Sequence, residues 1–493
     1  MAELLLNGII LILDMAGNGD LNLMKEVMLW MRPDPNAQSI TDKPSSSGNY
    51  NARLFTSELS YFSGKIRGYF RYKERTGSGL KYEEILANPH ILQAIYATTK
   101  SRVVPQIQLE DGTFVQDSSE IIDVIESHYP KNPIIPSAEN NPKQRLASYL
   151  IELFADEWLL VAAFSWRWSY SRDSDVPNHK DYNALQWGTW LNSKANGEER
   201  LKTGKGLFQM MAPDDGLVFK RGGAFRGLDC LGCTAQLQPY WEENTKKFLR
   251  LLEKHLGTHD YLLGGRPSLG DFGIIGPVYA HLYNDPVPGN IIKTEFPLVA
   301  QYVTRVMGIS SVNRSYDETI YTVDSDGKLV GRVSSSDNGD WLPNDEIPPT
   351  LIPMLQCFFT DFYPVLTEAM KTLKIYLHSS EHSIGSRLPE KSFGPTPGFG
   401  KAQMVDENGT LTHDFTIEGQ KGRRMVIPYT IWMMQRLFLQ NQVLKNIKMN
   451  QNVVDLLNQI GGNDMQNLGQ HLDGINIRKE GGLLYSSNTN SKL

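Results

Sequence analysis

The chain has 493 residues, of which 40% are hydrophobic and 21% are charged. Because domains typically contain about 100–150 residues, this length predicts two to four packed units, and the apolar content excludes a mostly disordered chain. Lys and Arg number 49 against 55 Asp and Glu, so the net charge is −6, which lacks the basic footprint of a nucleic-acid-binding protein. The three cysteines are too few for a disulfide framework, which favours a reducing compartment.

The first 50 residues are predicted to form an N-terminal extension and a linker. Residues 4–13 are apolar but shorter than the roughly 20 residues of a membrane span. Their flanks are Glu3 and Asp14, without the basic segment that precedes a signal sequence. This pattern favours a buried strand or short helix, and it favours a cytoplasmic protein. The alternative is that the segment targets the protein elsewhere. Residues 21–32 predict a helix, and the Ser-rich residues 43–48 predict a linker.

Residues 51–136 predict a compact α/β domain. Phe62, Ile66, Tyr69 and Phe70 share one helix face, and a further helix is expected over residues 89–99. Asp111-Gly112 predicts a hairpin turn. Short strands are expected at residues 53–56, 82–86, 106–109 and 113–115, and a third helix is expected after Ser118. The order β-α-β-α-β-β-α indicates a small mixed sheet.

The rest of the chain reads as mostly helical. Apolar periodicity over residues 146–164, 239–256 and 271–283 predicts an all-α domain spanning 137–310, and the polar residues 192–232 are expected to form surface loops. An additional, mostly helical region is expected over 311–440, with helices at 352–377 and 428–437 and a hairpin formed by 413–417 and 425–427. Residues 441–493 are expected to form a polar tail.

Four motifs follow one another in a characteristic order and spacing. They are residues 60–67 at the start of the first helix, Val104-Pro105 before the third strand, residues 116–118 before the third helix, and residues 261–273 in the helical domain. Together they resemble the glutathione S-transferase superfamily over residues 52–307. The resemblance implies a thioredoxin-like α/β N-terminal domain followed by an all-α C-terminal domain. Residues 345–348 and 422–429 look like an extended branch of this superfamily, with an additional C-terminal region.

The resemblance implies glutathione as a cosubstrate, and no metal. Such a site needs a backbone edge that pairs with the tripeptide, a place for its charged head, and a group that stabilises its thiolate. Pro105 would follow a cis bond, which costs far less before proline than before other residues, and Val104 would then offer its N–H and C=O to the tripeptide. The alternative is an ordinary proline at the start of a strand.

The pair Asp117-Ser118 fits the zwitterionic γ-glutamyl head. A serine at a helix N-terminus suits a carboxylate, and the Asp117 carboxylate can accept from the ammonium. A plain N-cap is the alternative, and both roles are compatible. Lys100 and Arg102 are candidates for the glycyl carboxylate, with surface charge as the alternative. Arg67 is expected on the solvent face of the first helix.

Ser60 is the first candidate for the thiolate-stabilising group. Lowering the thiol pKa by two units requires about 2.7 kcal/mol. A helix N-terminus contributes about 0.3–2 kcal/mol, and one hydrogen bond to a charged acceptor about 1.5–3 kcal/mol. Tyr61 is the alternative donor, followed by Ser63 and Ser57. A serine where redox-type members of the superfamily carry cysteine favours conjugation or lyase chemistry over disulfide reduction.

Other signals are given structural interpretations. The aromatic side chains between Trp158 and Tyr170 are expected to be core rather than to line an electrophile pocket between the domains, which Tyr429 and Trp432 would close. Ser268 and Asp271 have the spacing of a capping box. The CxxC pair Cys230 and Cys233 has no second pair with which to bind zinc, so two reduced thiols are expected.

The sequence therefore predicts a glutathione transferase that acts on a small, hydrophobic electrophile. A glutathione-dependent lyase, dehalogenase or isomerase with one specific substrate is the first alternative, because the additional C-terminal region suggests a closed pocket. A non-catalytic binding or scaffold protein that keeps the fold is the second. The resemblance also implies a homodimer. No nucleic-acid partner and no membrane span are expected.

Overall fold

A computed structural model describes most of the chain. It covers residues 34–46, 48–101, 103–170, 172, 174–211, 231–308, 321–331, 340–379, 382–388, 411–439, 450–465, 475–480 and 483–488. The apolar residues 4–13 and the predicted helix at 21–32 lie outside these ranges. None of the described helices is both long enough and apolar enough to cross a membrane.

The α/β domain has the predicted order of elements. A short 3-10 turn at Pro44–Ser46 precedes β1 (Ala52–Thr56), α3 (Tyr61–Arg75), β2 (Tyr82–Leu86), α4 (Pro89–Thr99), β3 (Gln106–Leu109), β4 (Phe114–Gln116) and α5 (Ser118–His128). The sheet order is β2-β1-β3-β4. Strand β1 is parallel to β2 and antiparallel to β3, and β3 is antiparallel to β4. The mixed α/β architecture is therefore confirmed.

Apolar residues at helical spacing form the core of this domain. Ile66, Tyr69 and Phe70 of α3 are fully buried, as are Ile121 and Ile125 of α5. This agrees with the helix faces that the sequence predicts. Both helices pack in one continuous core with β1 and the helical domain.

Arg67 does not lie on the solvent face, so that prediction is wrong. Its side chain is buried and donates to Glu58 Oε2 at 2.9 Å, Glu84 Oε1 at 2.5 Å and Thr56 Oγ1 at 3.1 Å. A guanidinium can be buried when its donors are paired in this way. Arg67 therefore ties α3 to the ends of β1 and β2.

Mostly helical elements follow the α/β domain. They are α6 (Pro142–Phe154), a π-helical segment at Ala155–Leu159, α7 (Leu160–Ser169), α8 (His179–Leu191), α9 (Gly197–Met211), α11 (Gln238–Leu256), α12 (Leu269–Pro277), a π-helical segment at Val278–Tyr283, α13 (Pro286–Glu295) and α14 (Pro297–Val306). The predicted helical segments are confirmed. Trp158, Phe164, Trp166 and Trp168 are buried, which agrees with their interpretation as core.

The expectation of surface loops over residues 192–232 is wrong for α9. This helix packs closely along α8: a Cβ atom on Gly188 would lie 1.7 Å from the Arg200 carbonyl oxygen, and one on Gly204 would lie 1.7 Å from that of Ala184. Gly204, which lies within the predicted loops, and Gly188 of α8 are the points where the two helix backbones approach one another. Residues 212–230 lie outside the described ranges.

The C-terminal region is built from short helices and strands that lie far apart along the chain. Its elements are β5 (Tyr321–Val323), β6 (Leu329–Gly331), a 3-10 turn at Pro343–Asp345, α15 (Ile352–Cys357), a π-helical segment at Phe358–Phe362, α16 (Tyr363–Leu377), β7 (Arg387–Leu388), β8 (Thr412–Ile417), β9 (Gln420–Met425), α17 (Pro428–Leu439), α19 (Gln451–Ile460), β10 (Ile475–Glu480) and β11 (Leu483–Asn488). The helices predicted at 352–377 and 428–437 are confirmed. The predicted hairpin is present as β8–β9, but its second strand is Gln420–Met425 rather than 425–427. Helix α19 and the hairpin β10–β11 lie within the residues assigned to a polar tail.

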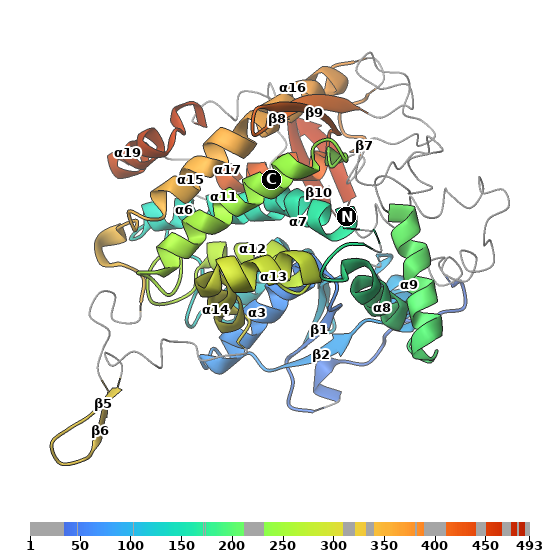
Figure 1. Cartoon of the computed structure of the whole chain (residues 1–493), viewed down its shortest axis with the longest axis horizontal. Coiled ribbons are helices and arrows are strands. Elements are labelled where there is room, and N and C mark those ends of the chain that lie inside the picture. The colour runs from blue at the N-terminus through green and yellow to red at the C-terminus, as the bar shows by residue number, and fades with distance from the viewer. Residues whose placement is uncertain are drawn as a thin grey trace.

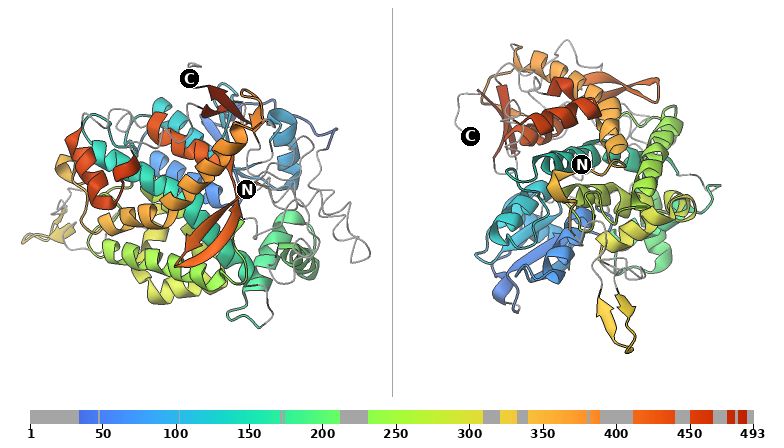
Figure 2. Two further views of the ribbon diagram at one scale, coloured as in Figure 1. Left: turned by 90° about the horizontal axis from the view of Figure 1, so that it is seen from above. Right: turned by 90° about the vertical axis from the view of Figure 1, so that its left-hand side faces the viewer.

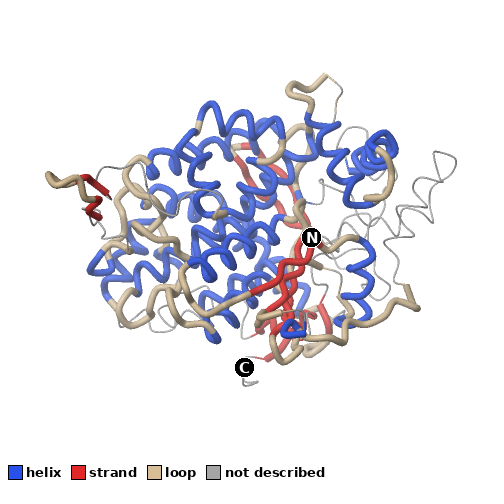
Figure 3. The backbone as a smooth tube through the Cα atoms, turned by 90° about the horizontal axis from the view of Figure 1, so that it is seen from below, coloured by secondary structure: helices blue, strands red, loops and turns tan. Residues whose placement is uncertain are grey.

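The C-terminal elements cover one side of the long α6–α7 segment. In Figure 1 these elements, apart from the hairpin β5–β6, lie above it, whereas β1 and β2 lie below, and the second view of Figure 2 shows the same arrangement. Strand β11 pairs with both β10 and β7. The hairpin β5–β6 projects away from the body of the molecule, and Figure 3 shows it as a pair of short strands outside the mostly helical body.

Candidate active site

Three loops that carry predicted site residues meet at one end of the strands of the α/β sheet. Phe55, near the end of β1, pairs with Gln106 at the start of β3, and Gln106 also pairs with Gln116 at the end of β4. The segment after β1 leads to Ser60, the segment before β3 contains Val104, and the segment after β4 leads to Asp117. The register therefore brings these three residues to the same end of the sheet, although they are far apart in sequence.

Ser60 is the N-cap of α3, in a turn held by short-range hydrogen bonds. Its Oγ accepts from the Ser63 N–H at 3.3 Å, and its own N–H donates to the Ser57 carbonyl at 3.1 Å. The side chain is half-buried, and its hydroxyl hydrogen has no acceptor among the residues that the structure describes. A free hydroxyl donor at a helix N-terminus can stabilise an anion.

The other predicted hydroxyls, those of Tyr61 and Ser63, belong to buried side chains. Tyr61 is only 3% exposed, and its hydroxyl donates to the Ala155 carbonyl. Burial raises the pKa of Tyr61 well above its usual value, as do the nearby carboxylates of Asp156 and Glu157. Ser63 is fully buried, and its Oγ accepts from the Ser57 N–H at 3.1 Å. The use of the Tyr61 hydroxyl as a donor and the complete burial of Ser63 favour Ser60 over both.

Arg167 was not among the predicted site residues, but it holds the Ser60 turn from the helical domain. Its guanidinium donates to the Leu59 carbonyl at 3.0 Å and forms two 2.8 Å bonds with the Asp285 carboxylate. Both side chains are 1% exposed. A charged residue inside the apolar run of α7 was the available signal, because a buried charge needs partners.

Val104 lies where a peptide ligand would pair with the backbone. The Val104–Pro105 bond is cis, as the resemblance implied. The Val104 side chain packs with Phe55 and Ile95, and within the described ranges neither its N–H nor its C=O has a hydrogen-bond partner. Its backbone is therefore available for pairing.

Of the two predicted cations, the described residues include Lys100 but not Arg102. Lys100 is the left-handed C-cap of α4, and its Nζ donates to the Ala97 carbonyl at 3.0 Å. This contact serves the helix end, and the side chain is exposed. Arg102 lies outside the described residues.

Asp117 is the N-cap of α5, and Ser118 is the first residue of that helix. The Oδ1 atom of Asp117 accepts from the Ser119 N–H at 3.0 Å, and its φ of 90° is unusual for a residue other than glycine. Ser118 is 4% exposed, and its hydroxyl makes no hydrogen bond among the described residues. Asp117 and Ser118 therefore lie at the N-terminus of α5, where the sequence predicted the third helix.

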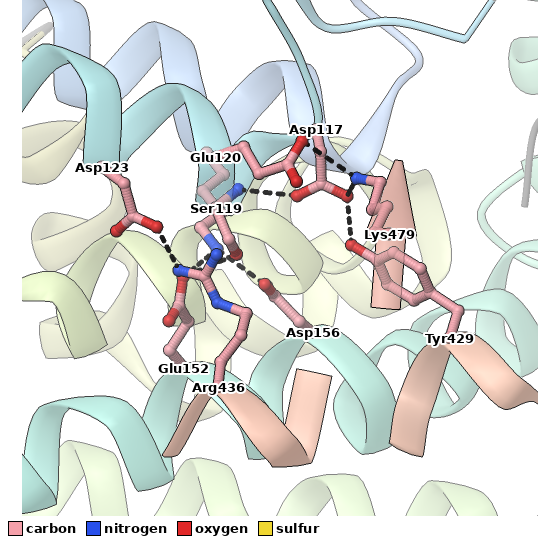
Figure 4. Close-up of polar contacts among 10 residues, drawn as sticks. Asp117, Ser119, Glu120, Asp123, Glu152, Asp156, Tyr429, Arg436 and Lys479 are labelled. Carbon is pink, nitrogen blue, oxygen red and sulfur yellow. Dashed lines mark hydrogen bonds and ion pairs between the residues drawn. The ribbon is translucent and has the colours of Figure 1, made fainter. Parts of the chain in front are cut away.

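The C-terminal region supplies further partners to Asp117. Its Oδ2 atom accepts from the Lys479 ammonium of β10 at 3.0 Å and from the Tyr429 hydroxyl of α17 (Figure 4). Burial on its own would raise the pKa of Asp117, but Lys479 and Tyr429 outweigh this effect and lower the pKa to about 2. The carboxylate is therefore ionised and already paired with a cation from its own chain.

The Lys479 ammonium lies in a cage of carboxylates and aromatic rings. It is 3.2 Å from Glu120 Oε2, 4.7 Å from the centre of the Trp432 ring and 5.8 Å from that of Tyr429. The side chain is 6% exposed. Tyr429 and Trp432 thus cover the start of α5, and no sequence signal links them to Asp117.

Buried charges connect α3, α5 and α6 beneath this cage. Lys65 Nζ lies 2.7 Å from Glu152 Oε1 and 2.6 Å from Asp156 Oδ2, and the Ser119 hydroxyl donates to Glu152 at 3.0 Å. Burial raises the pKa of Asp156 to about 7 despite the opposing Lys65 ammonium. The network is drawn in Figure 4 below Asp117.

A cavity of about 620 Å³ lies between the helical domain and the C-terminal region. Its walls come from α11, α16 and the hairpin β8–β9, and Trp158 is among them. Asp361 and Glu418 both accept from the Asn244 amide at its rim. None of the predicted thiol-site or head-group residues lines it.

Among the described residues, the cysteines and the side chains that could bind a metal form no second candidate site. Cys233 is buried with its Sγ 3.5 Å from the Val161 carbonyl, and Cys357 is also a buried free thiol. Cys230 lies outside the described ranges. Within those ranges, no group of three or more His, Cys, Asp and Glu side chains could hold a metal ion.

Comparison with known proteins identifies two domains. Residues 54–133 match the family model for the glutathione S-transferase N-terminal domain, and residues 221–305 match that for the C-terminal domain. No curated protein matches the chain.

Similar solved structures share little sequence with the chain. A glutathione S-transferase from Rhodospirillum rubrum F11 is 14% identical, covers 52% of this chain and 87% of its own, and has a TM-score of 0.31. The beta-etherase LigF from Sphingobium sp. strain SYK-6 is 15% identical, with coverages of 52% and 94% and a TM-score of 0.34. Ure2p5 from Phanerochaete chrysosporium, cocrystallized with 1-(S-glutathionyl)-2,4-dinitrobenzene, is 13% identical, with coverages of 52% and 90% and a TM-score of 0.27.

The two family models match in the order in which the α/β and helical domains follow one another. Residues 54–133 and 221–305 therefore belong to the N- and C-terminal domains of the glutathione S-transferase superfamily.

Proposed function

We propose that this protein is a glutathione-dependent transferase that activates the thiol of glutathione through Ser60. The observation that carries the proposal is the Ser60 hydroxyl, which caps α3 and has no acceptor among the described residues, whereas the Tyr61 hydroxyl donates to the Ala155 carbonyl and Ser63 is fully buried. Together with the helix N-terminus, one hydrogen bond to the sulfur supplies the roughly 2.7 kcal/mol that a pKa shift of two units needs. The thiolate then adds to a small, hydrophobic electrophile.

Two further loops support the binding of the tripeptide. The backbone of Val104, which has no hydrogen-bond partner among the described residues, would offer one N–H and one C=O to the cysteinyl residue of glutathione. We propose that Asp117, the N-cap of α5, accepts from the γ-glutamyl ammonium, and that Ser118, at the start of α5, donates to its carboxylate. Lys100 and Arg102 are proposed for the glycyl carboxylate. Glutathione-dependent lyase, dehalogenase or isomerase chemistry would use the same thiolate.

The experiment is an ultraviolet titration of the thiolate in the glutathione complex. We expect the thiol of bound glutathione to titrate well below that of free glutathione. Ser60→Ala should raise the pKa of the bound thiol by about 1–2 units, the equivalent of one hydrogen bond to a charged acceptor. Ser60→Thr, which keeps a hydroxyl, is the matched control. An unshifted thiol in the natural protein, or no binding to immobilised glutathione, would contradict the proposal.

A second candidate is a binding or scaffold protein that keeps the fold without catalysis. The observation that favours it is the pairing of Asp117 with Lys479 and Tyr429 of the same chain. If Ser60→Ala loses nothing measurable, this candidate replaces the first. A cytoplasmic location, predicted from the sequence pattern, and a homodimer, implied by the resemblance, stay predictions.

A further inference from the structure

We propose that β10 is an intramolecular cap whose Lys479 ammonium holds the place of the γ-glutamyl ammonium of glutathione on Asp117. The inference rests on the proposed function, which gives Asp117 this role. It adds that the natural protein binds glutathione only when its own lysine leaves the anchor. Lys479 is thereby a built-in competitor of the ligand.

The chemical match is between two primary ammonium groups. The amino terminus of the γ-glutamyl residue and the Lys479 side chain both carry a compact cation with three N–H donors. Lys479 directs this cation to Asp117 Oδ2 at 3.0 Å and to Glu120 Oε2 at 3.2 Å, against the ring of Trp432. The cage therefore satisfies the group that a γ-glutamyl head would bring.

Asp117 has little capacity left for a second ammonium. A carboxylate has about four acceptor positions, and three donors already occupy this one: the Ser119 N–H, the Tyr429 hydroxyl and the Lys479 ammonium. A ligand ammonium on the same carboxylate would lie beside that of Lys479, and like charges at such a distance repel one another. Occupation by Lys479 and by glutathione should therefore exclude each other.

Helix α17 holds β10 in the capping position. The Ile477 N–H donates to Gln435 Oε1 at 2.9 Å, and Gln435 Nε2 donates to Asn476 Oδ1 at 3.1 Å. On the same helix, Arg436 pairs with Asp123 of α5 at 2.9 Å. The cap is thus a packed strand, anchored by α17 to the helix that it covers.

The neighbouring residue Arg478 provides a matched control. It belongs to the same strand, but successive side chains of a strand point to opposite faces. Arg478 contacts Glu480 and the ring of Tyr485 rather than Asp117, and its side chain is 41% exposed. Removing its charge changes the strand to a similar extent without freeing the anchor.

The test is the affinity of the full chain for glutathione, measured by calorimetry for the natural protein, Lys479→Met and Arg478→Met. If the binding-competent fraction is small, the apparent dissociation constant is raised by that fraction. We expect Lys479→Met to bind glutathione at least ten-fold more tightly than the natural protein, and Arg478→Met to bind like the natural protein. Asp117→Asn added to Lys479→Met should abolish the gain.

Each other outcome has a distinct meaning. Equal affinity of the natural protein and Lys479→Met, or weaker binding by the variant, overturns the cap and leaves glutathione binding in place. A gain that survives Asp117→Asn also overturns the cap, because the freed carboxylate would not be the cause. No binding by either protein overturns the proposed function, and the cap with it.

A measurement on the natural protein avoids dependence on the fold of Lys479→Met. Backbone hydrogen exchange of residues 475–480 should accelerate when the protein is saturated with glutathione, because the strand leaves α5. Unchanged or slower exchange in the saturated protein would overturn the cap. Tyr429→Phe offers a second variant: it removes one donor from Asp117 but keeps the ring, so a smaller gain in affinity is expected.

Discussion

The guanidinium of Arg167 donates a 3.0 Å hydrogen bond to the carbonyl of Leu59, the residue directly before Ser60. Arg167 also forms a buried, bidentate pair with Asp285 and donates to the Ala280 carbonyl. A residue of the helical domain therefore fixes the turn that presents the proposed thiolate donor. This contact makes Arg167 a positioning residue for Ser60.

Arg167→Lys should raise the pKa of the bound glutathione thiol. The lysine keeps one charge beside Asp285, but it lacks the planar fork that reaches Asp285 and Leu59 together. We expect the thiol pKa to move toward that of free glutathione, and the free energy of unfolding to fall by about 1–3 kcal/mol because buried donors and acceptors lose partners. The thiolate titration and a denaturant unfolding curve measure both effects.

Arg71→Lys is the control for this change. Arg71, on α3, also donates to a backbone carbonyl, that of Met307 at 3.1 Å, but it lies in the third turn of the helix rather than beside Ser60. This variant should leave the thiol pKa unchanged. If Arg167→Lys also leaves it unchanged, Arg167 holds the fold but does not position Ser60.

Tyr61→Phe should cost stability without moving the thiol pKa. The Tyr61 hydroxyl donates to the Ala155 carbonyl in the core, and a Cβ atom on Gly276 would lie 2.4 Å from the Tyr61 ring. The ring is thus closely packed between the two domains. Loss of the hydroxyl removes one buried hydrogen bond, so we expect unfolding to require about 1–2 kcal/mol less. A titration in which Tyr61→Phe rather than Ser60→Ala raises the thiol pKa would reassign the donor to Tyr61.

The sequence allowed the α/β domain to be predicted because its signals are local. Helix faces such as Ile66 and Tyr69, the turn Asp111-Gly112, and the caps Ser60 and Asp117 act within a few residues along the chain. The predictions of a solvent-facing Arg67 and of loops at α9 were wrong because burial and close helix contact depend on partners that lie elsewhere in the sequence. Local pattern does not show which polar or small residue finds such a partner.

The cage around Lys479 was beyond prediction for the same reason. Tyr429 and Lys479 lie 312 and 362 residues from Asp117 along the chain. Residues 475–480 carry three charges in succession, which resembles a polar tail, yet Ile477 is buried. One buried apolar residue per strand is too weak a signal to distinguish a packed hairpin from a tail.

Asp271→Asn should destabilise the helical domain strongly. The predicted capping box is present: Asp271 Oδ2 accepts from the Ser268 N–H at 2.7 Å, and Oδ1 accepts from the Leu262 N–H at 3.0 Å and from the Tyr302 hydroxyl. An amide replaces one acceptor oxygen by a donor, which leaves a buried N–H facing donors. We expect a loss of about 2–4 kcal/mol in the free energy of unfolding. Asp181→Asn, in the first turn of the more exposed α8, should cost under about 1 kcal/mol.

Glu157→Gln should flatten the dependence of stability on pH. Burial raises the pKa of Glu157 from 4.5 to about 8, with Thr430 and Arg424 opposing the shift and Asp156 adding to it. The native state therefore keeps a proton that the unfolded chain releases above pH 4.5, so the free energy of unfolding decreases as the pH rises through this window. Glutamine cannot ionise, and the variant should gain on the order of a few kcal/mol relative to the natural protein between the two ends of the window.

Unfolding curves between pH 5 and pH 9 measure this gain. Asp156, whose pKa is raised to about 7, contributes a decrease in the same direction, so Glu157→Gln should reduce the slope without removing it. Glu295→Gln, at the exposed end of α13, is the matched control for the exchange of a glutamate for a glutamine. A slope in Glu157→Gln as steep as that of the natural protein would mean that Glu157 ionises near its ordinary pKa in the native state, and that its contact with Thr430 offsets the burial of the carboxylate.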